Sequence, residues 1–187
     1  AVTHAVDTRA AAREQAASLG AKIIDIDIPD ELAQGEGGYA KALSHEMLKK
    51  ERDMIAPHLE KMDIVFLSAL VPGKMAPVII TRDMMKKMKP GSVIVDISID
   101  QGGNCEATVP GEVADEGMVH VVGIKNIPGM LPASSTWMFS QNMYNLVRYL
   151  VKDNAISLDM SDEIVRGILT TRDGEIVHEG AREAMGL

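Results

Sequence analysis

The sequence has a single cysteine, Cys105, among its 187 residues, so the chain can form no internal disulfide, and we expect a reducing compartment. One thiol cannot supply a set of metal ligands. The five histidines are scattered without the spacing of a zinc motif, and the Gly-x-Ser-x-Gly turn of a serine hydrolase does not occur. We therefore predict no metal site and interpret Cys105 as a small, partly buried residue.

Basic residues are also few, since 19 Lys and Arg stand against 27 Asp and Glu, which gives a net charge of -8. Binding a polyanion requires clustered cations, so we predict no nucleic-acid partner. The longest apolar stretch, around residues 64–72, is far shorter than the roughly 20 residues that span a bilayer, and Ala1 opens no signal peptide. A membrane role would require another chain.

What the sequence does contain is an alternation of strand-like and helix-like segments over residues 1–130. Continuous Val and Ile runs are typical of parallel strands that are buried on both faces. The predicted fold class is α/β, a Rossmann-like doubly wound parallel sheet. The expected strands are 2–6, 21–28, 63–70, 92–98 and 119–124, and the expected helices are 10–19, 45–62 and 82–88, with Ser44 and Thr81 as N-caps.

The pattern changes after residue 130. Residues 131–152 are expected to form a connecting helix, capped at Ser134 or Ser135 and ending at Val151. Its buried stripe is expected to consist of apolar residues at helical spacing, namely Met138, Met143, Leu146, Val147 and Leu150.

The last segment, residues 153–187, places Asp173-Gly174 between two β-prone runs, which predicts a two-residue hairpin turn. An isolated hairpin is marginally stable, so we interpret this segment as an arm that packs on another domain or subunit. The alternative is a hairpin folded back on the sheet of this chain.

Asp7 is the first candidate binding residue, because it ends the first expected strand. A carboxylate at that place in a dinucleotide-binding fold accepts the hydroxyls of the adenosine ribose and repels the 2′-phosphate of NADP. An Asp that ends a strand is also a common turn or cap residue. Arg9, two residues later, is able to meet a phosphate, which leaves the choice between NAD and NADP open.

Two further loops follow strands, at the sheet edge where ligands of open α/β folds bind. Ser68, Ala69 and Leu70 are candidates for backbone contacts to a cofactor, or for the close packing of a crossover. The loop 99–112 brings Asp100, Gln101 and Asn104 beside two glycines. Asp100 is a candidate general acid or base if it is buried, and otherwise a solvated carboxylate.

The stretches "GGYAKALS", "DIVFLSALVPGKMAPVIITRDMMKKMKPGSVIVDISIDQGGNCEATVPGE" and "TTRDGEIVH" closely resemble the alpha subunit of proton-translocating NAD(P) transhydrogenase. The chain is more distantly similar to alanine dehydrogenase. "SIDQGG" looks more like alanine dehydrogenase, in which the aspartate matching Asp100 is an acid/base candidate. "GGNCEATVPGE" and the closing hairpin look more like transhydrogenase.

The transhydrogenase resemblance implies a domain that binds NAD(H) and passes hydride to NADP on a separate domain, while a membrane domain couples the exchange to proton movement. It implies that Asp7, Thr8 and Arg9 contact the adenosine ribose and that Ser68, Ala69 and Leu70 form the strand-end contact. Gly38 and Tyr39 match the family's mobile loop, which would make the long unpatterned segment 29–44 a lid. A homodimer, and a cytoplasmic location peripheral to the inner membrane, are further implications.

The family's first Rossmann strand, its glycine turn and its preceding N-terminal domain have no counterpart here. We therefore expect an unpaired strand edge where that strand would lie, and an arm that packs on the missing domain. Three hypotheses follow: the NAD-binding part of a Re/Si-specific transhydrogenase alpha subunit, inactive as an isolated chain; an alanine dehydrogenase-like amino-acid oxidoreductase; or a non-catalytic interaction module.

Overall fold

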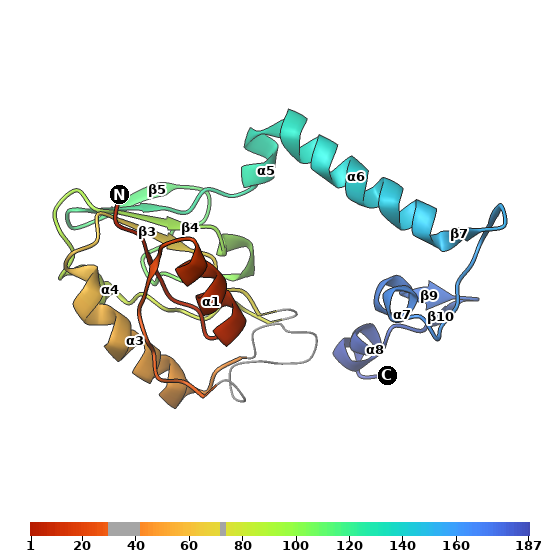
Figure 1. The fold of residues 1–187 in the computed structure, drawn as a ribbon, viewed down its shortest axis with the longest axis horizontal. Coiled ribbons are helices and arrows are strands. Elements are labelled where there is room, and N and C mark those ends of the chain that lie inside the picture. The colour runs from red at the N-terminus through yellow and green to blue at the C-terminus, as the bar shows by residue number, and fades with distance from the viewer. Residues whose placement is uncertain (30–41, 72–73) are drawn as a thin grey trace. The chain divides into compact units, whose positions relative to one another are not determined.

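The computed structural model describes residues 1–29, 42–71 and 74–187 (Figure 1). The chain divides into two compact units, Ala1–Ile127 and Pro128–Leu187. The first unit holds the strands and helices of the α/β region. The second holds the long helix and the hairpins that follow it.

The first unit begins with a strand-helix-strand motif. Strand β1 (His4–Ala5) pairs in parallel with β2 (Lys22–Ile23), and α1 (Ala10–Ser18) connects them. After β2, Ile24, Ile26 and Ile28 are buried while the residues between them are exposed, the alternation expected of a strand with one face on the core.

A second sheet has the strand order β3-β4-β6-β5. Strands β3 (Ile64–Leu67), β4 (Val93–Asp96) and β6 (Val119–Val122) are parallel, as predicted. Strand β5 (Val113–Glu116) was not predicted, and it lies antiparallel to β6 at the edge of the sheet. The sheet is therefore mixed rather than purely parallel.

The expected helices of the first unit are present, and their predicted caps are confirmed. Helix α3 (His45–Leu59) begins where the Ser44 hydroxyl accepts from the Met47 N–H, and α4 (Arg82–Met85) begins where the Thr81 hydroxyl accepts from the Met84 N–H. A short 3-10 helix, η2 (Ile99–Gln101), follows β4.

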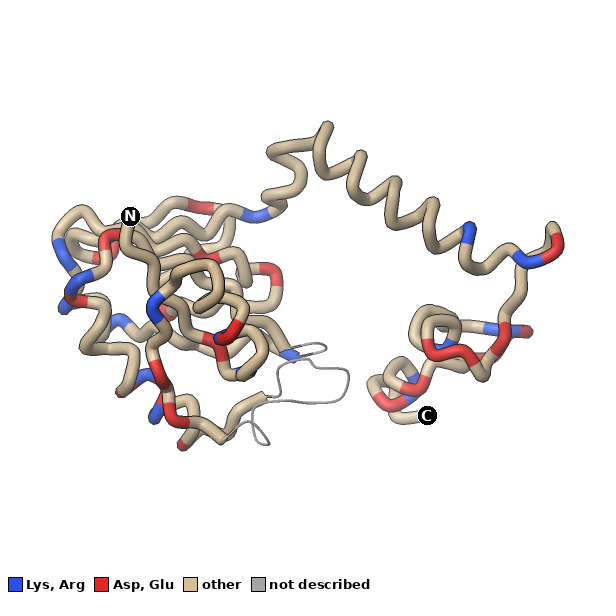
Figure 2. Tube along the Cα trace, in the orientation of Figure 1, with Lys and Arg blue, Asp and Glu red and all other residues tan. Residues whose placement is uncertain are grey.

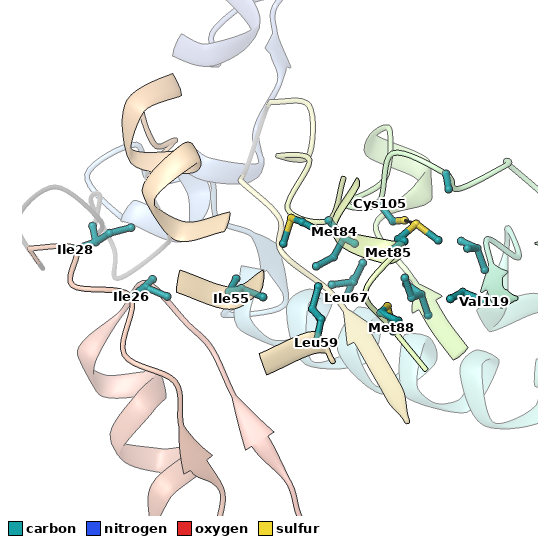
Figure 3. Close-up of a cluster of buried hydrophobic side chains, with 14 residues drawn as sticks. Ile26, Ile28, Ile55, Leu59, Leu67, Met84, Met85, Met88, Cys105 and Val119 are labelled. Atoms are coloured by element: carbon teal, nitrogen blue, oxygen red, sulfur yellow. Dashed lines mark hydrogen bonds between the residues drawn. The ribbon is translucent and has the colours of Figure 1, made fainter. Parts of the chain in front are cut away.

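The core lies between these helices and the strands (Figure 3). Ile55 and Leu59 of α3 lie on the side of Leu67 of β3, and the α4 region adds three methionines to the same cluster, which also contains Cys105. These methionines are Met84, Met85 and Met88. Cys105 is 4% exposed, so this small residue is buried more completely than the sequence analysis expects.

Strand β3 is not the fully buried strand that its apolar sequence predicts. Ile64 and Phe66 are 68% and 62% exposed, while Leu67 is buried. Within the described residues, β1 pairs with β2 alone and β3 with β4 alone. One edge of each strand therefore lacks a backbone partner among the described residues, which agrees with the unpaired strand edge that the sequence analysis expects.

The second unit is dominated by α6 (Pro132–Leu150), which follows the short helix α5 (Ile127–Met130). Proline occupies the first turn of α6, so the helix begins before the predicted cap at Ser134 or Ser135. None of its residues is buried, and the predicted stripe is wrong on this point, since Met138 and Val147 are each 55% exposed. Arg148 is the one charged residue of α6, which Figure 2 shows as a tan helix with one basic position near its end.

Two hairpins follow α6. The predicted turn is confirmed, since Asp173 and Gly174 both have positive φ angles, 52° and 85°, between β9 (Thr171–Arg172) and β10 (Glu175–Ile176). The second hairpin was not anticipated; it joins β7 (Val151–Lys152) and β8 (Ala155–Ile156) through Asp153-Asn154. Helices α7 (Glu163–Ile168) and α8 (Glu179–Met185) complete the unit.

In neither unit do the described residues include a helix with the length and apolar character needed to cross a bilayer.

Candidate functional site

Asp7 lies two residues after the end of β1 and forms a bidentate pair with Arg9. The Arg9 Nε donates to Asp7 Oδ1 at 3.0 Å, and Nη2 donates to Oδ2 at 2.9 Å. The Arg9 backbone N–H also donates to Oδ1, at 2.8 Å, so the carboxylate closes the turn that leads into α1. The Arg9 and Asp7 side chains are 37% and 31% exposed, respectively, which leaves both within reach of a ligand.

Burial and charge act in opposite directions on this carboxyl group. Desolvation raises the pKa of Asp7, but the hydrogen bonds and charge of Arg9, with the charge of Arg13, outweigh it, so the pKa is lowered. The Arg13 guanidinium also donates to the carbonyl oxygens of Asp7 and Thr8, at 3.0 and 2.8 Å. The turn therefore holds an ionised carboxylate that is paired with the Arg9 guanidinium and is further stabilised by the charge of Arg13.

Glu51 of α3 is a buried carboxyl group that the sequence interpretation missed. It is 5% exposed, and desolvation raises its pKa to about 7, with the charge of Arg52 opposing the shift and that of Asp7 adding to it. Glu51 stands four residues before Ile55 and eight before Leu59, both in the core, so helical spacing was the signal that placed it on the buried face.

The second predicted contact, Ser68-Ala69-Leu70, follows β3. Ser68 and Leu70 are exposed, whereas Ala69 is half-buried. Both backbone groups of Ala69 bond to the side chain of Asn104, since the Ala69 N–H donates to Oδ1 and the Ala69 carbonyl accepts from Nδ2, each at 2.9 Å. The Ala69 N–H is thus committed within the protein, and Ser68 and Leu70 are the exposed residues of this turn.

The loop after β4 is organised by Asp96, which is 1% exposed. Its Oδ2 accepts from the backbone N–H groups of Asn104 and Cys105, at 2.7 and 3.0 Å, and from the Thr108 hydroxyl at 2.8 Å. A β-carbon at Gly103 would approach this oxygen to 2.8 Å, so the close turn requires glycine there.

Asp100 and Gln101 do not join Asn104 in one polar site. Both are exposed on η2, while Asn104 is fully buried and bonds to Ala69 instead. Asp100 was a candidate general acid or base only if it were buried, and in this structure it is exposed.

The two strand ends are attached to the same hydrophobic core. Val6 and Leu67, which immediately precede Asp7 and Ser68, pack in a single hydrophobic cluster. Residues at the carboxyl ends of such strands border the ligand crevice of open α/β folds. Gly38 and Tyr39 lie outside the described residues.

A hollow of about 550 Å³ is found elsewhere, between the segment after β2 and the start of α3. Its lining includes Asp27, Ser44 and Lys50 and none of the predicted site residues. Among the residues that the structure describes, no group of three His, Cys, Asp or Glu side chains is placed to hold a metal ion.

Comparison with known proteins gives a family match over most of the chain. The model described as "Alanine dehydrogenase/PNT, C-terminal domain" matches residues 1–179. An NAD(P) transhydrogenase alpha-subunit protein of Rhodospirillum rubrum is 43% identical over 183 residues, covering 95% of this chain and 47% of that protein. Alanine dehydrogenase 1 of Staphylococcus aureus is 31% identical over 177 residues, covering 84% of this chain and 47% of that protein. The chain thus spans about half the length of these relatives.

Solved structures give the same picture. The crystal structure of transhydrogenase from Sinorhizobium meliloti superposes with a TM-score of 0.74 at 38% identity, covering 95% of this chain and 46% of that chain. An L-alanine dehydrogenase, at 24% identity and a TM-score of 0.63, shares the fold. These likenesses confirm the Rossmann-like architecture predicted from the sequence.

Proposed function

Because this chain belongs to the alanine dehydrogenase/PNT family, we propose that it is the NAD(H)-binding part of a proton-translocating NAD(P) transhydrogenase. The observation that carries the proposal is the half-exposed Asp7 carboxylate, which follows β1, together with the exposed turn after β3, since the residues before both belong to one hydrophobic core. The higher identity to transhydrogenase subunits, 43% against 31% for an alanine dehydrogenase, supports this function over amino-acid oxidation.

In this proposal, the site residues bind and orient the dinucleotide. Asp7 accepts hydrogen bonds from the adenosine ribose hydroxyls through lone pairs that Arg9 does not use, while Thr8 and Arg9 border the same turn. Ser68, Ala69 and Leu70 border the cofactor where it crosses the sheet edge. The Asp7 carboxylate disfavours a 2′-phosphate, and Arg9 is already occupied by Asp7, so we favour NAD over NADP.

The proposed hydride transfer requires little acid or base catalysis by the residues of this chain. The bound nicotinamide supplies or accepts the hydride, and transfer between two nicotinamides requires alignment of the rings. That Asp100 is exposed on η2 agrees with this requirement. The chain's own contribution is therefore positioning.

The proposed partners follow from the names of the relatives, which are alpha-subunit proteins. They are NADP-binding and membrane-spanning subunits, a polypeptide segment that pairs with the open edges of β1 and β3, and a second copy of the chain. The proposed location is cytoplasmic, peripheral to the inner membrane through those subunits. In this proposal, Re/Si-specific hydride transfer requires the whole assembly, and the isolated chain does not catalyse it.

Titration of the chain with NADH, followed by nucleotide fluorescence and calorimetry, tests the proposal. We expect saturable one-to-one binding, weakened about 10-fold or more in Asp7→Asn, because a hydrogen bond to a charged group contributes roughly 1.5–3 kcal/mol. Asp83→Asn is the matched control, since Asp83 is an exposed aspartate that pairs with Lys86 on α4. Absence of NADH binding by a chain that circular dichroism shows to be folded would contradict the proposal.

A further inference from the structure

The side chain of Asn104 is committed entirely to one neighbouring loop. Its Oδ1 accepts from the Ala69 N–H, and its Nδ2 donates to the carbonyl oxygens of Ala69 and Pro77, at 2.9 and 2.8 Å. Asn104 is 0% exposed, so water does not compete for these bonds. The carboxamide thus bonds to Ala69 as a neighbouring peptide group would, through both donor and acceptor.

Asn104 is itself fixed by its backbone. Its N–H donates to the buried Asp96 carboxylate at 2.7 Å, and its carbonyl oxygen accepts from the N–H groups of Ile79 and Ile80, at 2.7 and 3.0 Å. The carboxamide therefore extends from a fixed loop to the turn after β3, where it bonds to both backbone groups of Ala69. Few rotamers satisfy all three side-chain bonds at once.

We propose that Asn104 is a positioning residue of the nucleotide site, acting through Ala69 on the exposed residues Ser68 and Leu70. This inference rests on the proposed function. By holding both peptide groups of Ala69, the carboxamide sets the direction in which the chain leaves β3, and with it the surface that Ser68 and Leu70 present to the dinucleotide. Preorganisation of this kind increases affinity because the turn need not be ordered on binding.

Asn104→Ala removes the carboxamide, so the N–H and the carbonyl oxygen of Ala69 lose their bonds to it. We expect the variant to bind NADH at least about 10-fold more weakly than the wild-type chain, by calorimetry. A second readout is local. Hydrogen exchange at the Ala69 amide should become at least about 10-fold faster, while the Ile97 amide, which donates to the Leu67 carbonyl, keeps its rate.

Met85→Ala is the matched control for a general loss of stability. Met85 is 2% exposed and contacts Cys105, the residue after Asn104, but it does not bond to Ala69. NADH affinity within about two-fold of wild type in this variant, at comparable destabilisation, separates positioning from stability. If Asn104→Ala does not fold, Asn104→Ser takes its place, because its hydroxyl is too short to reproduce all three bonds.

The outcomes separate the inference from the function on which it rests. Wild-type NADH affinity in a folded Asn104 variant would overturn the positioning role and leave the proposed function standing. Equal weakening in the Asn104 and Met85 variants would also overturn it, since stability alone would then account for the loss. Failure of the wild-type chain to bind NADH would overturn the proposed function itself, and the role of Asn104 in binding with it.

Discussion

At the scale of single residues, the site combines two carboxyl groups in different environments. Asp7 is ionised because the hydrogen bonds and charge of Arg9, with the charge of Arg13, lower its pKa, whereas Glu51, buried on α3, holds its proton to about pH 7. The charge of Asp7 is one of the causes that raise the pKa of Glu51. A pair of this kind keeps the negative charge on the half-exposed group, for which we propose a role in binding, and suppresses it on the group that faces the core.

Glu51 predicts a pH dependence of stability. The folded chain retains the Glu51 proton up to about pH 7, while the unfolded chain releases it near pH 4.5. A rising pH therefore favours the unfolded chain across this window, and the free energy of unfolding should fall by about 3 kcal/mol before levelling off above pH 7. Urea denaturation of the wild-type chain and of Glu51→Gln, between pH 4.5 and 8, measures this contribution.

The control for this prediction is the neutral variant itself. Glu51→Gln keeps the size of the side chain but cannot titrate, so the difference between the two pH profiles belongs to Glu51. Parallel profiles would show that Glu51 ionises alike in the folded and unfolded chains. The comparison would then contradict burial of the carboxyl group.

At the scale of secondary-structure elements, helix α4 delivers Met84 and Met85 to the core from a helix of four residues. Such a short helix depends on its cap, because most of its N–H groups have no partner within the helix. Thr81→Ala removes the hydroxyl that accepts from the Met84 N–H, and should lower the free energy of unfolding by about 1 kcal/mol. Thr81→Ser retains that acceptor, and chemical denaturation should place it near wild type.

The elements were predictable where their signals are local, and less so where they depend on distant partners. Ser44, Thr81 and Asp173-Gly174 act within a few residues, and each is found as predicted. Strand β5 was missed because its short sequence contains no apolar run. It is a strand because it pairs with β6, which its own residues do not indicate. The exposure of Ile64 and Phe66 depends on which strand or helix covers β3, which the residues of β3 do not encode.

The candidate site divides in the same way. Asp7 was found because strand alternation ends there, and Glu51 was detectable from its spacing with Ile55 and Leu59. The bonds between Asn104 and Ala69 join residues 35 positions apart and follow no short-range pattern. The sequence analysis placed Asn104 in a polar loop that follows a strand, but it carried no signal of the bonds to the neighbouring turn.

At the scale of the whole molecule, the chain spans about half of its relatives and has unpaired edges on β1 and β3 within the described residues. A chimera in which this chain replaces the matching part of the Rhodospirillum rubrum relative supplies the other half of the architecture. Combined with the remaining subunits of that transhydrogenase, the chimera should transfer hydride between NADH and NADP. Stopped-flow or steady-state absorbance measures the rate.

The same chimera separates the two enzyme hypotheses through Asp100. If hydride passes directly between nicotinamides, Asp100→Asn should retain the rate within about two-fold, because no proton is taken from a substrate. In an amino-acid dehydrogenase, loss of the acid/base group costs roughly 10²–10⁴-fold. A near-total loss in Asp100→Asn, with Asp115→Asn as a control on β5, would favour amino-acid oxidation. An unchanged rate would agree with the exposure of Asp100 on η2. It would mean that this chain contributes to hydride transfer by aligning the two nicotinamide rings and not by acid or base catalysis.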